Sequence, residues 1–219
     1  MSQVFIVSAP SGTGKTTLNT KLARENSCVE ISISHTTRTM RSGEIQGQSY
    51  HFVDRDVFQQ MILRGEMLEW AEVFGNLYGT SKQEIDRITK DGKKVLLEID
   101  VQGARSVLMQ LSTATSIFIL PPSVEELWRR LENRGTDRLD DRWKRLMTAK
   151  HEIEVGYLYE HFLINDDRDK AFDELKKVII EGKHSSLTHS EGVKLCQNLL
   201  EEFDTSPLLH SLREKMGEF

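Results

Sequence analysis

The stretch Val4-Phe5-Ile6-Val7-Ser8-Ala9-Pro10-Ser11-Gly12-Thr13-Gly14-Lys15-Thr16-Thr17 decides the fold of this 219-residue chain. Its first four residues form an apolar run that predicts a buried strand, and the residues from Leu18 to Glu25 predict a helix. A loop of small residues between a strand and a helix, ending in Gly-Lys-Thr, is a phosphate cradle, because its backbone N–H groups point inward. Lys15 then reaches the terminal phosphates, and the Thr16 hydroxyl ligates Mg²⁺.

One position of this loop departs from the usual pattern, because Ala9 stands where glycine is expected. An alanine is harmless there if its φ is negative and costly if φ must be positive. The alternative for the whole stretch is a chance turn rich in Gly and Ser. The strand before the loop, the helix after it and the Lys-Thr pair in register disfavour that alternative.

The composition excludes several classes of protein. A net charge of −5 and a pI near 5.8 argue against a general nucleic-acid binder, which is usually basic. The two cysteines make no disulfide framework and have no metal-ligand spacing, so a reducing, cytoplasmic location is expected. No apolar run approaches the ~18 residues that span a bilayer, and no signal peptide is evident, so we expect no membrane partner.

The remaining apolar runs indicate an α/β protein. Val95–Ile99 and Ser116–Leu120 predict two more buried strands, with weaker candidates at Val29–Ser34 and His161–Ile164. Helices that begin with a serine cap and a glutamate three residues later are predicted from Ser81 and from Ser123. This alternation favours a doubly wound parallel sheet with helices on both faces.

Two stretches interrupt the alternation. Residues 34–79 hold short strand-like pieces and one helix, which predicts a small inserted lobe. Residues 133–146 are dense in charge, which is typical of a solvated helix face or of a lid. The predicted core therefore comprises residues 1–33, 80–132 and 147–183. The sequence assigns no role to the C-terminal extension, residues 184–219, and does not fix the oligomeric state.

A second cluster of anion-binding side chains follows the predicted strand that ends at Ser34. Arg38 and Arg41 lie three residues apart, after hydroxyl side chains and before Tyr50. An arginine binds a phosphate through two parallel, charge-assisted N–H···O bonds. The cluster is either a second phosphate site or an ordinary surface loop, and the presence of the first phosphate loop favours the site.

Three carboxylates are candidates for recognising a ligand. Glu69 and Glu72 are three residues apart, so on one strand they face opposite sides and only one can line a given pocket. Asp100 follows a buried strand, where open α/β sheets place their ligands. Asp100 is also suited to cap the next helix, and the two roles are compatible.

Taken together, these motifs resemble the guanylate kinase family over about residues 3–182. The resemblance rests on the loop Ala9–Thr16, on Ser34-His35-Thr36-Thr37-Arg38-Thr39-Met40-Arg41 and on Gly43-Glu44. It continues with Leu68-Glu69-Trp70-Ala71, Tyr78-Gly79-Thr80, Glu98–Gly103, Leu120–Ser123, Arg134–Asp137 and Asn165-Asp166. It implies a P-loop NTPase core with an inserted GMP-binding lobe and a short lid, and the reaction ATP + GMP → ADP + GDP with Mg²⁺.

The resemblance also implies a role for each matching position. The residues that bind ATP are Ala9, Pro10, Ser11, Gly12, Thr13, Gly14, Lys15, Thr16, Thr17 and Asn165. Those that bind GMP are Ser34, Arg38, Arg41, Tyr50, Glu69, Tyr78, Thr80 and Asp100. Lys15, Arg38, Arg134 and Arg145 act on the transferring phosphoryl group. Mg²⁺ is held by Thr16, with Asp100 as a further ligand through water.

The chemistry of these residues agrees with GMP as the acceptor. Guanine presents N1–H and N2–H₂ side by side, so the Glu69 carboxylate accepts from both, whereas adenine leaves it unmatched, which discriminates by ~10⁴-fold. We expect dGMP to be accepted as well. A kinase of another phosphorylated small molecule, such as a ribose phosphate, would not need Ser34, Glu69 and Thr80 together. A scaffold domain that binds phosphorylated peptides without catalysis tends to lose Lys15 and Thr16.

The chain departs from the family pattern at two places. Arg142 stands where an aliphatic residue is usual, so Arg142 or Lys144 can compete for the role of Arg145. The proline that usually follows Arg38 is replaced by Thr39, which predicts a looser loop.

Overall fold

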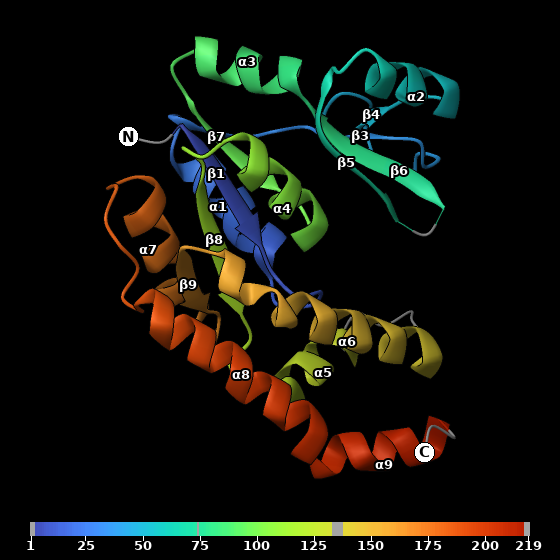
Figure 1. The fold of residues 1–219 in the computed structure, drawn as a ribbon, viewed down its shortest axis with the longest axis vertical. Helices are drawn as coiled ribbons and strands as arrows, with labels where there is room; N and C mark the ends of the chain where they lie inside the picture. The colour runs from blue at the N-terminus through green and yellow to red at the C-terminus, as the bar shows by residue number, and fades with distance from the viewer. Residues whose placement is uncertain (1–2, 74, 133–137, 217–219) are drawn as a thin grey trace. The chain divides into compact units, whose positions relative to one another are not determined.

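The apolar runs of the sequence form a five-stranded sheet in the computed structural model, which describes residues 3–73, 75–132 and 138–216 (Figure 1). In sheet order the strands are β2 (Val29–Ile31), β7 (Lys94–Glu98), β1 (Val4–Ser8), β8 (Thr115–Leu120) and β9 (His161–Ile164). β2 pairs with β7, and β8 with β9, in parallel. Nearly every residue of β1 and β8 is buried, as in a parallel sheet covered on both faces. The predicted α/β class is confirmed.

The boundaries of two elements differ from the predicted ones. β2 ends at Ile31 and not at Ser34, although the Ser32 N–H still donates to Leu96 O at 3.0 Å. α1 (Lys15–Glu25) begins at Lys15 and not at Leu18. The Leu18 N–H donates to Gly14 O at 3.3 Å, so the first helical turn starts directly from the glycine loop.

The chain divides into two compact units, Met1–Ile6 with Asn19–Thr115, and Val7–Leu18 with Ser116–Phe219. The first unit holds a second sheet, in the order β4 (His51–Phe52), β3 (His35–Thr36), β6 (Asn76–Ser81) and β5 (Met67–Val73). The helix α2 (Arg55–Leu63) covers this sheet through Phe58, which packs against Met67 and Leu77. These short strands and the single helix are the elements that the sequence predicts for residues 34–79.

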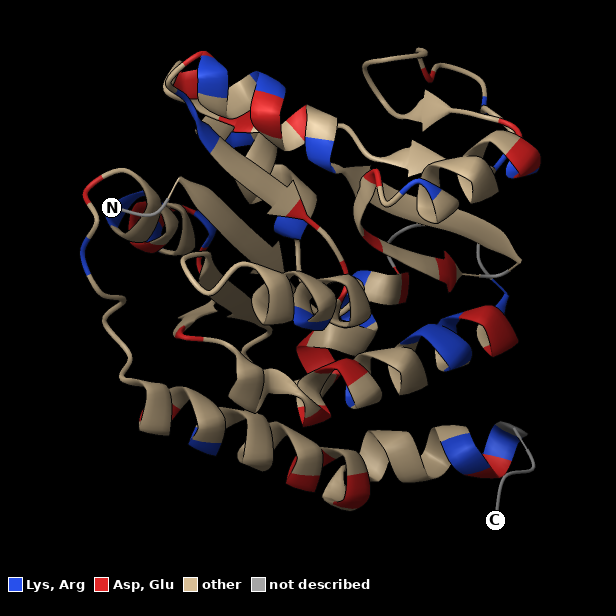
Figure 2. Ribbon diagram, turned by 45° about the horizontal axis from the view of Figure 1, so that its top comes forward, with Lys and Arg blue, Asp and Glu red and all other residues tan. Residues whose placement is uncertain are grey.

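Two helices of the first unit begin at capped residues. The Ser81 Oγ accepts from the Glu84 N–H (3.3 Å) before α3 (Lys82–Lys90), and Asp100 accepts from the Gly103 N–H (2.8 Å) before α4 (Val101–Gln110). The predicted reciprocal bond from Glu84 does not form, because its carboxylate binds Arg87 and accepts from the Ile33 N–H (3.0 Å). Basic and acidic residues alternate along α3 (Figure 2), whose buried residues are Glu84 and Ile88.

The second unit surrounds the phosphate loop with helices. They are α5 (Val124–Glu132), α6 (Leu139–Glu154), the 3₁₀ turn η1 (Gly156–Leu158), α7 (Arg168–Ile179), α8 (His189–Thr205) and α9 (Pro207–Met216). Trp143, Leu146, Ala149 and Ile153 form the buried face of α6 at helical spacing. α6 therefore runs without a break through residue 146, where the predicted lid ends.

The C-terminal extension belongs to the second unit, in which α8 lies along α6 and near α5 (Figure 1). A capping box between Thr188 and Glu191 begins α8, and its buried face includes Cys196, Leu199 and Phe203. The Glu202 Oε2 accepts from the Val124 N–H (2.8 Å) at the start of α5. The extension therefore satisfies a backbone donor of α5 that has no partner within its own helix.

Within the described ranges, none of the helices combines the length and the hydropathy that crossing a membrane requires.

Candidate functional site

The phosphate loop between β1 and α1 has the backbone that its glycines predict. Gly12 and Gly14 have φ values of 97° and 101°, in the left-handed region that side chains rarely adopt. The Thr13 N–H donates to Pro10 O at 3.1 Å, which closes a turn inside the loop. Lys15 and Thr16 follow as the first two residues of α1, at the end of the helix that favours anions.

Side chains from distant elements hold this loop. The Asn165 Nδ2, after β9, donates to Thr13 O at 2.6 Å. The Arg130 Nη2, on α5, donates to Asn165 O at 2.8 Å, and its Nε bonds Glu126 at 2.7 Å. A Cβ added at Gly14 would meet the Asn165 Nδ2 at 2.7 Å, so glycine is required there for space as well as for φ. Sequence reasoning identified Asn165 but missed Arg130, which no local pattern marks.

A pocket of about 370 Å³ opens beside the loop in the second unit. Its lining combines the loop with basic side chains of α5 and with residues after β9: Gly12, Thr13, Gly14, Thr17, Glu126, Arg129, Arg130, Asn165, Asp166 and Arg168. Arg129 and Arg130 both bond Glu126 and hold the pKa of that carboxyl down, at about 2. The pocket therefore offers backbone amides and fixed cations, which suit a polyphosphate.

α6 brings Arg145 to the loop. Its Nη2 and Nε lie 3.0 and 3.3 Å from the Ser11 Oγ. Arg142, the competing arginine, bonds Glu132 at 3.1 Å and lies 5.6 Å over the Trp128 ring, both on α5. Lys144 is exposed. Of the three basic residues at issue, Arg145 is the one whose contact with the loop the structure records. Arg134 lies outside the described residues.

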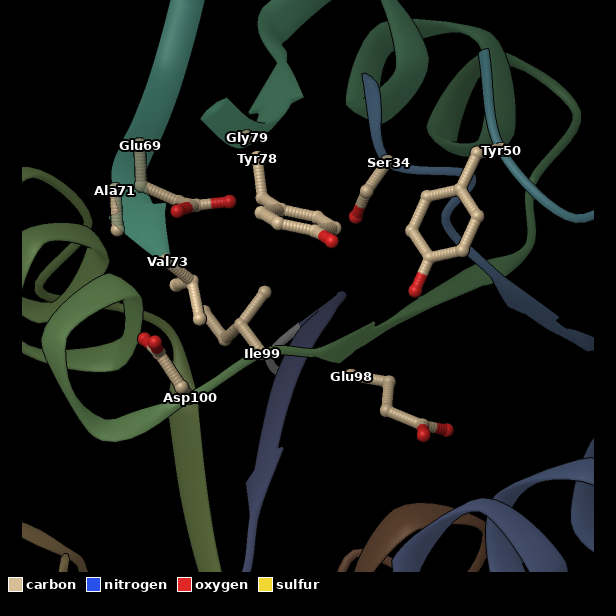
Figure 3. A pocket seen from close by; sticks show the side chains of 10 residues that line it. All are labelled: Ser34, Tyr50, Glu69, Ala71, Val73, Tyr78, Gly79, Glu98, Ile99 and Asp100. Carbon is tan, nitrogen blue, oxygen red and sulfur yellow. The ribbon is translucent and has the colours of Figure 1, made fainter. Parts of the chain in front are cut away.

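A second pocket, of about 230 Å³, lies within the first unit (Figure 3). Strands of both sheets and the turn before α4 contribute its lining: Ser34, Tyr50, Glu69, Ala71, Val73, Tyr78, Gly79, Glu98, Ile99 and Asp100. In Figure 3 the Glu69 carboxylate and the hydroxyls of Ser34, Tyr50 and Tyr78 are directed into one space. Five of the eight residues predicted to bind GMP therefore line a single pocket, namely Ser34, Tyr50, Glu69, Tyr78 and Asp100.

Strand alternation selects Glu69 over Glu72 for this pocket. Glu69, Ala71 and Val73 share one face of β5 and all line the pocket. Glu72 faces the other side, where it is exposed and pairs with Arg55 at 3.1 Å. The prediction that only one of the two glutamates lines the pocket is confirmed.

The Glu69 carboxyl is shielded from solvent. Only 6% of the residue is exposed. Burial raises the pKa of this carboxyl to about 7, and the nearby charge of Asp100 adds to the rise. The Glu69 Oε2 lies 2.8 Å from where a Cβ of Gly103 would stand, so the absent side chain of Gly103 leaves the room that the carboxylate occupies. Sequence reasoning gave no role to Gly103.

Two of the predicted polar residues surround Glu69. Thr80 pairs with Glu69 across β5 and β6, and its Oγ1 is buried. The side chain and backbone of Thr80 interact with the Glu69 carboxyl and partly oppose the rise in its pKa. Asp100 uses one carboxylate oxygen to cap α4. The capping role and the position in the pocket coexist, as the sequence allows.

Of the two arginines predicted to bind a phosphate, Arg38 is held by an ion pair and Arg41 is exposed. The Arg38 guanidinium makes two bonds to the Glu44 carboxylate, at 2.7 and 3.1 Å, which raise the pKa of Arg38. It also lies 5.5 Å over the Tyr50 ring, so it borders the pocket. Arg41 is exposed, and the bond recorded for it is from its backbone N–H to Glu44 at 2.7 Å. Glu44 belongs to the Gly43-Glu44 motif, but its contacts with both arginines are evident only in the structure.

Another cluster, Glu160 with His161 and His184, has ligand atoms within 4.8 Å of one another. The His161 Nδ1 lies 3.3 Å from both the Ser185 backbone N and the Ser185 Oγ, and its Nε2 lies 3.7 Å from the Glu160 carboxylate. Burial lowers the pKa of His161.

Comparisons with known proteins identify the family. A family model described as guanylate kinase matches residues 1–182. The guanylate kinase of Alkalilimnicola ehrlichii is 46% identical over 181 residues, covering 83% of this chain and 89% of the relative. That of Dechloromonas aromatica is 49% identical over 176 residues, covering 80% and 87%. A crystal structure of guanylate kinase from Anaplasma phagocytophilum is 30% identical with a TM-score of 0.65, covering 99% of this chain and 95% of that chain.

These matches confirm the resemblance seen in the sequence, including its P-loop kinase fold. The chain belongs to the guanylate kinase family, and it transfers the γ-phosphoryl group of ATP to GMP.

Proposed function

We propose that the buried Glu69 carboxylate reads the guanine base and thereby limits the acceptor to GMP and dGMP. The observation that carries this proposal is an acidic side chain, 6% exposed, that lines a pocket without a basic side chain among its lining residues. Guanine offers two adjacent donors, N1–H and N2–H₂, to the two carboxylate oxygens. Adenine offers an acceptor at N1, so it would leave a buried oxygen unpaired.

Other polar residues in and beside the pocket complete the base site. Ser34, which lines the pocket, and Thr80, which pairs with Glu69 on the neighbouring strand, donate their hydroxyl hydrogens to the guanine O6. Asp100 supports the base through the carboxylate oxygen that does not cap α4. Gly103 keeps the Glu69 carboxylate free to turn toward the base, because no side chain fills that space.

The GMP phosphate binds beside the base, to Arg38, Arg41 and the hydroxyls of Tyr50 and Tyr78. Arg38 is already fixed by Glu44 and by its position over the Tyr50 ring. A guanidinium held in this way offers its remaining N–H groups to a phosphate at little cost in side-chain entropy. Arg41 is exposed and orders on binding.

ATP binds along the loop Ala9–Thr17, with its phosphates on the loop amides and on Lys15. Asn165 closes the adenine side, since it borders the pocket next to the loop. Thr16 stands exposed in the first turn of α1, where its hydroxyl would hold Mg²⁺. The ion would supply positive charge to the phosphates of ATP.

Transfer itself needs alignment and cations more than covalent help. Lys15, Arg38, Arg134 and Arg145 stabilise the charge that develops on the γ-phosphoryl group. No general base is needed, because the attacking oxygen of GMP is already an anion. Closure of the lobe, residues 34–79, and the lid, residues 133–146, excludes the water that would otherwise hydrolyse ATP.

A coupled assay of ADP release with GMP, dGMP, AMP, CMP and UMP tests this proposal. We expect turnover with GMP and dGMP and at least ~10³-fold lower kcat/KM with AMP. In Glu69→Gln the preference for GMP over AMP falls, because a neutral amide no longer accepts from both guanine donors. An unchanged preference would mean that the base is read by other residues. Equal turnover with a ribose phosphate would point to the alternative sugar-phosphate kinase.

The proposal includes a cytoplasmic location for the enzyme. Both cysteines are free thiols, with Cys28 exposed and Cys196 buried. Burial raises the pKa of the Cys196 thiol to about 12. Unpaired thiols are typical of a reducing cytoplasm, where the product GDP would enter purine nucleotide metabolism.

A further inference from the structure

The Ser11 residue of the phosphate loop is held from two sides by one helix. The Glu152 Oε2 accepts from the Ser11 N–H at 3.1 Å, and the Arg145 Nη2 donates to the Ser11 Oγ at 3.0 Å. Arg145 and Glu152 lie seven residues apart on α6, which places them on the same face two turns apart. A single rigid element therefore sets both the backbone and the side chain of Ser11.

We propose that Glu152 is a positioning residue of the reaction: it fixes the Ser11 amide against α6, so that the loop amides and Arg145 are aligned for the phosphates of ATP. The inference rests on the proposed ATP site at this loop. Glu152 itself need not touch ATP, because its contact is to the loop backbone.

α6 is suited to carry such a contact because it is itself firmly held. Its buried face packs into the core, and Lys150 bonds Asp204 of α8 at 2.9 Å while lying 5.7 Å over the Phe203 ring. A carboxylate on this helix therefore presents its oxygen at a defined place. In a triphosphate-binding loop, small displacements of a donor weaken its bond to the transition state steeply.

The charge of Glu152 makes its presence informative. A carboxylate beside a loop that binds a polyphosphate repels the ligand. If charge were its only effect, removal of the charge would strengthen ATP binding. A positioning role predicts a different result: activity depends on the length of the side chain and on its acceptor oxygen, and not on its charge.

Two conservative variants separate these effects. Glu152→Gln keeps the length of the side chain and an acceptor oxygen but loses the charge. Glu152→Asp keeps the charge but is one methylene shorter, so it cannot reach the Ser11 N–H. Glu154→Asp is the matched control, because Glu154 is exposed on the same helix and bonds His151. Both changes from Glu to Asp lie in the last turn of α6.

The assay measures kcat and both KM values by ADP release, together with the melting temperature. We expect Glu152→Asp to lower kcat/KM for ATP about tenfold or more, because a loop amide loses its partner. KM for GMP stays within about twofold in the same variant, and Glu152→Gln and Glu154→Asp stay within about threefold of the parent in every constant. A lower melting temperature with unchanged kinetic constants would reduce Glu152 to a structural residue and overturn the inference. Impaired Glu152→Gln beside normal Glu152→Asp would also overturn it, since charge would then be what matters.

A parallel Lys15→Ala variant distinguishes this inference from the ATP site on which it rests. If Lys15→Ala is slow and Glu152→Asp has normal kinetic constants, the proposed role of Glu152 is refuted and the ATP site is not. A normal rate in Lys15→Ala refutes the role of the loop, and the inference with it.

Discussion

The raised pKa of Glu69 predicts that GMP binding weakens as the pH falls through neutrality. Guanine donates two hydrogens to this side chain, so only the ionised carboxylate accepts both. The pKa of the buried carboxyl is about 7, against 4.5 for the free group, so acidification protonates it within the range in which the enzyme works. GMP that binds below pH 7 therefore releases, on average, more than about half a proton from Glu69.

The size of the effect follows from the pKa. The dissociation constant for GMP rises by a factor of about 1 + 10^(7−pH), which is about 2 at pH 7 and about 11 at pH 6. At pH 8 the dissociation constant rises by a factor of only about 1.1. The sign is fixed by the direction of the shift: the binding-competent carboxylate is present above the pKa and is lost as the pH falls through it.

Isothermal titration calorimetry of GMP between pH 5.5 and 8.5, at constant ionic strength, measures this dependence directly. At pH 6, titration in two buffers of different ionisation enthalpy reports the released proton. The GMP phosphate titrates near pH 6 as well, so Glu69→Gln provides the baseline that contains the phosphate alone. Glu72→Gln is the matched control, because Glu72 lies on the same strand but is exposed. Equal pH dependence in Glu69→Gln and the parent protein would refute the reasoning.

Three further predictions concern single side chains. Arg145→Ala is expected to lower kcat by ~10³-fold or more, because Arg145 contacts the phosphate loop. Arg142→Ala is expected to lower kcat by less than about tenfold and the free energy of unfolding by about 1 kcal/mol, because Arg142 contacts Trp128 instead of the loop. Steady-state assays measure kcat, and denaturant titration measures the stability. Gly103→Ala is expected to raise KM for GMP about tenfold with little change in KM for ATP, because its Cβ would stand 2.8 Å from the Glu69 Oε2. Without nucleotide, Glu69→Gln is expected to raise the melting temperature at pH 8 but not at pH 4. Above the raised pKa of Glu69, its ionised carboxylate destabilises the folded protein by up to about 3 kcal/mol, and the variant removes this charge. Equal melting shifts at the two pH values would contradict this account.

The sequence predicts those parts of the fold that depend on local patterns. Short apolar runs marked β1, β7 and β8, and serines marked the starts of α3 and α5. The reciprocal bonds of the two capping boxes did not form, because Glu84 and Glu126 bind arginines instead. An ion pair to a nearby arginine competes with a bond to a backbone N–H, and the spacing alone does not reveal which wins.

In the candidate site, too, the sequence predicts the features that depend on local patterns and not those that depend on contacts between distant residues. Strand alternation predicted that at most one of Glu69 and Glu72 lines a given pocket, since the period of a strand is two. The Ser11 N–H donates to Glu152, 141 positions away, and the Asn165 side chain donates to Thr13 O, 152 positions away. Resemblance to a family marked Asn165, but no local rule marks Glu152. Contacts of that range depend on how whole elements pack, so only the structure reveals them.

Carboxylates hold the arginines that border both pockets. Glu44 binds Arg38 through two bonds, and Glu126 binds Arg130 at 2.7 Å. A solvated arginine samples many rotamers, and a phosphate that binds it must then order it. A carboxylate partner orders the guanidinium during folding, so this entropy is already lost when an anion arrives. Local, ordered cations therefore suffice for nucleotide phosphates in a chain whose net charge is −5, whereas a long nucleic-acid backbone requires an extended basic surface. The acidic composition argues against a nucleic-acid partner and leaves a nucleotide substrate open for this reason.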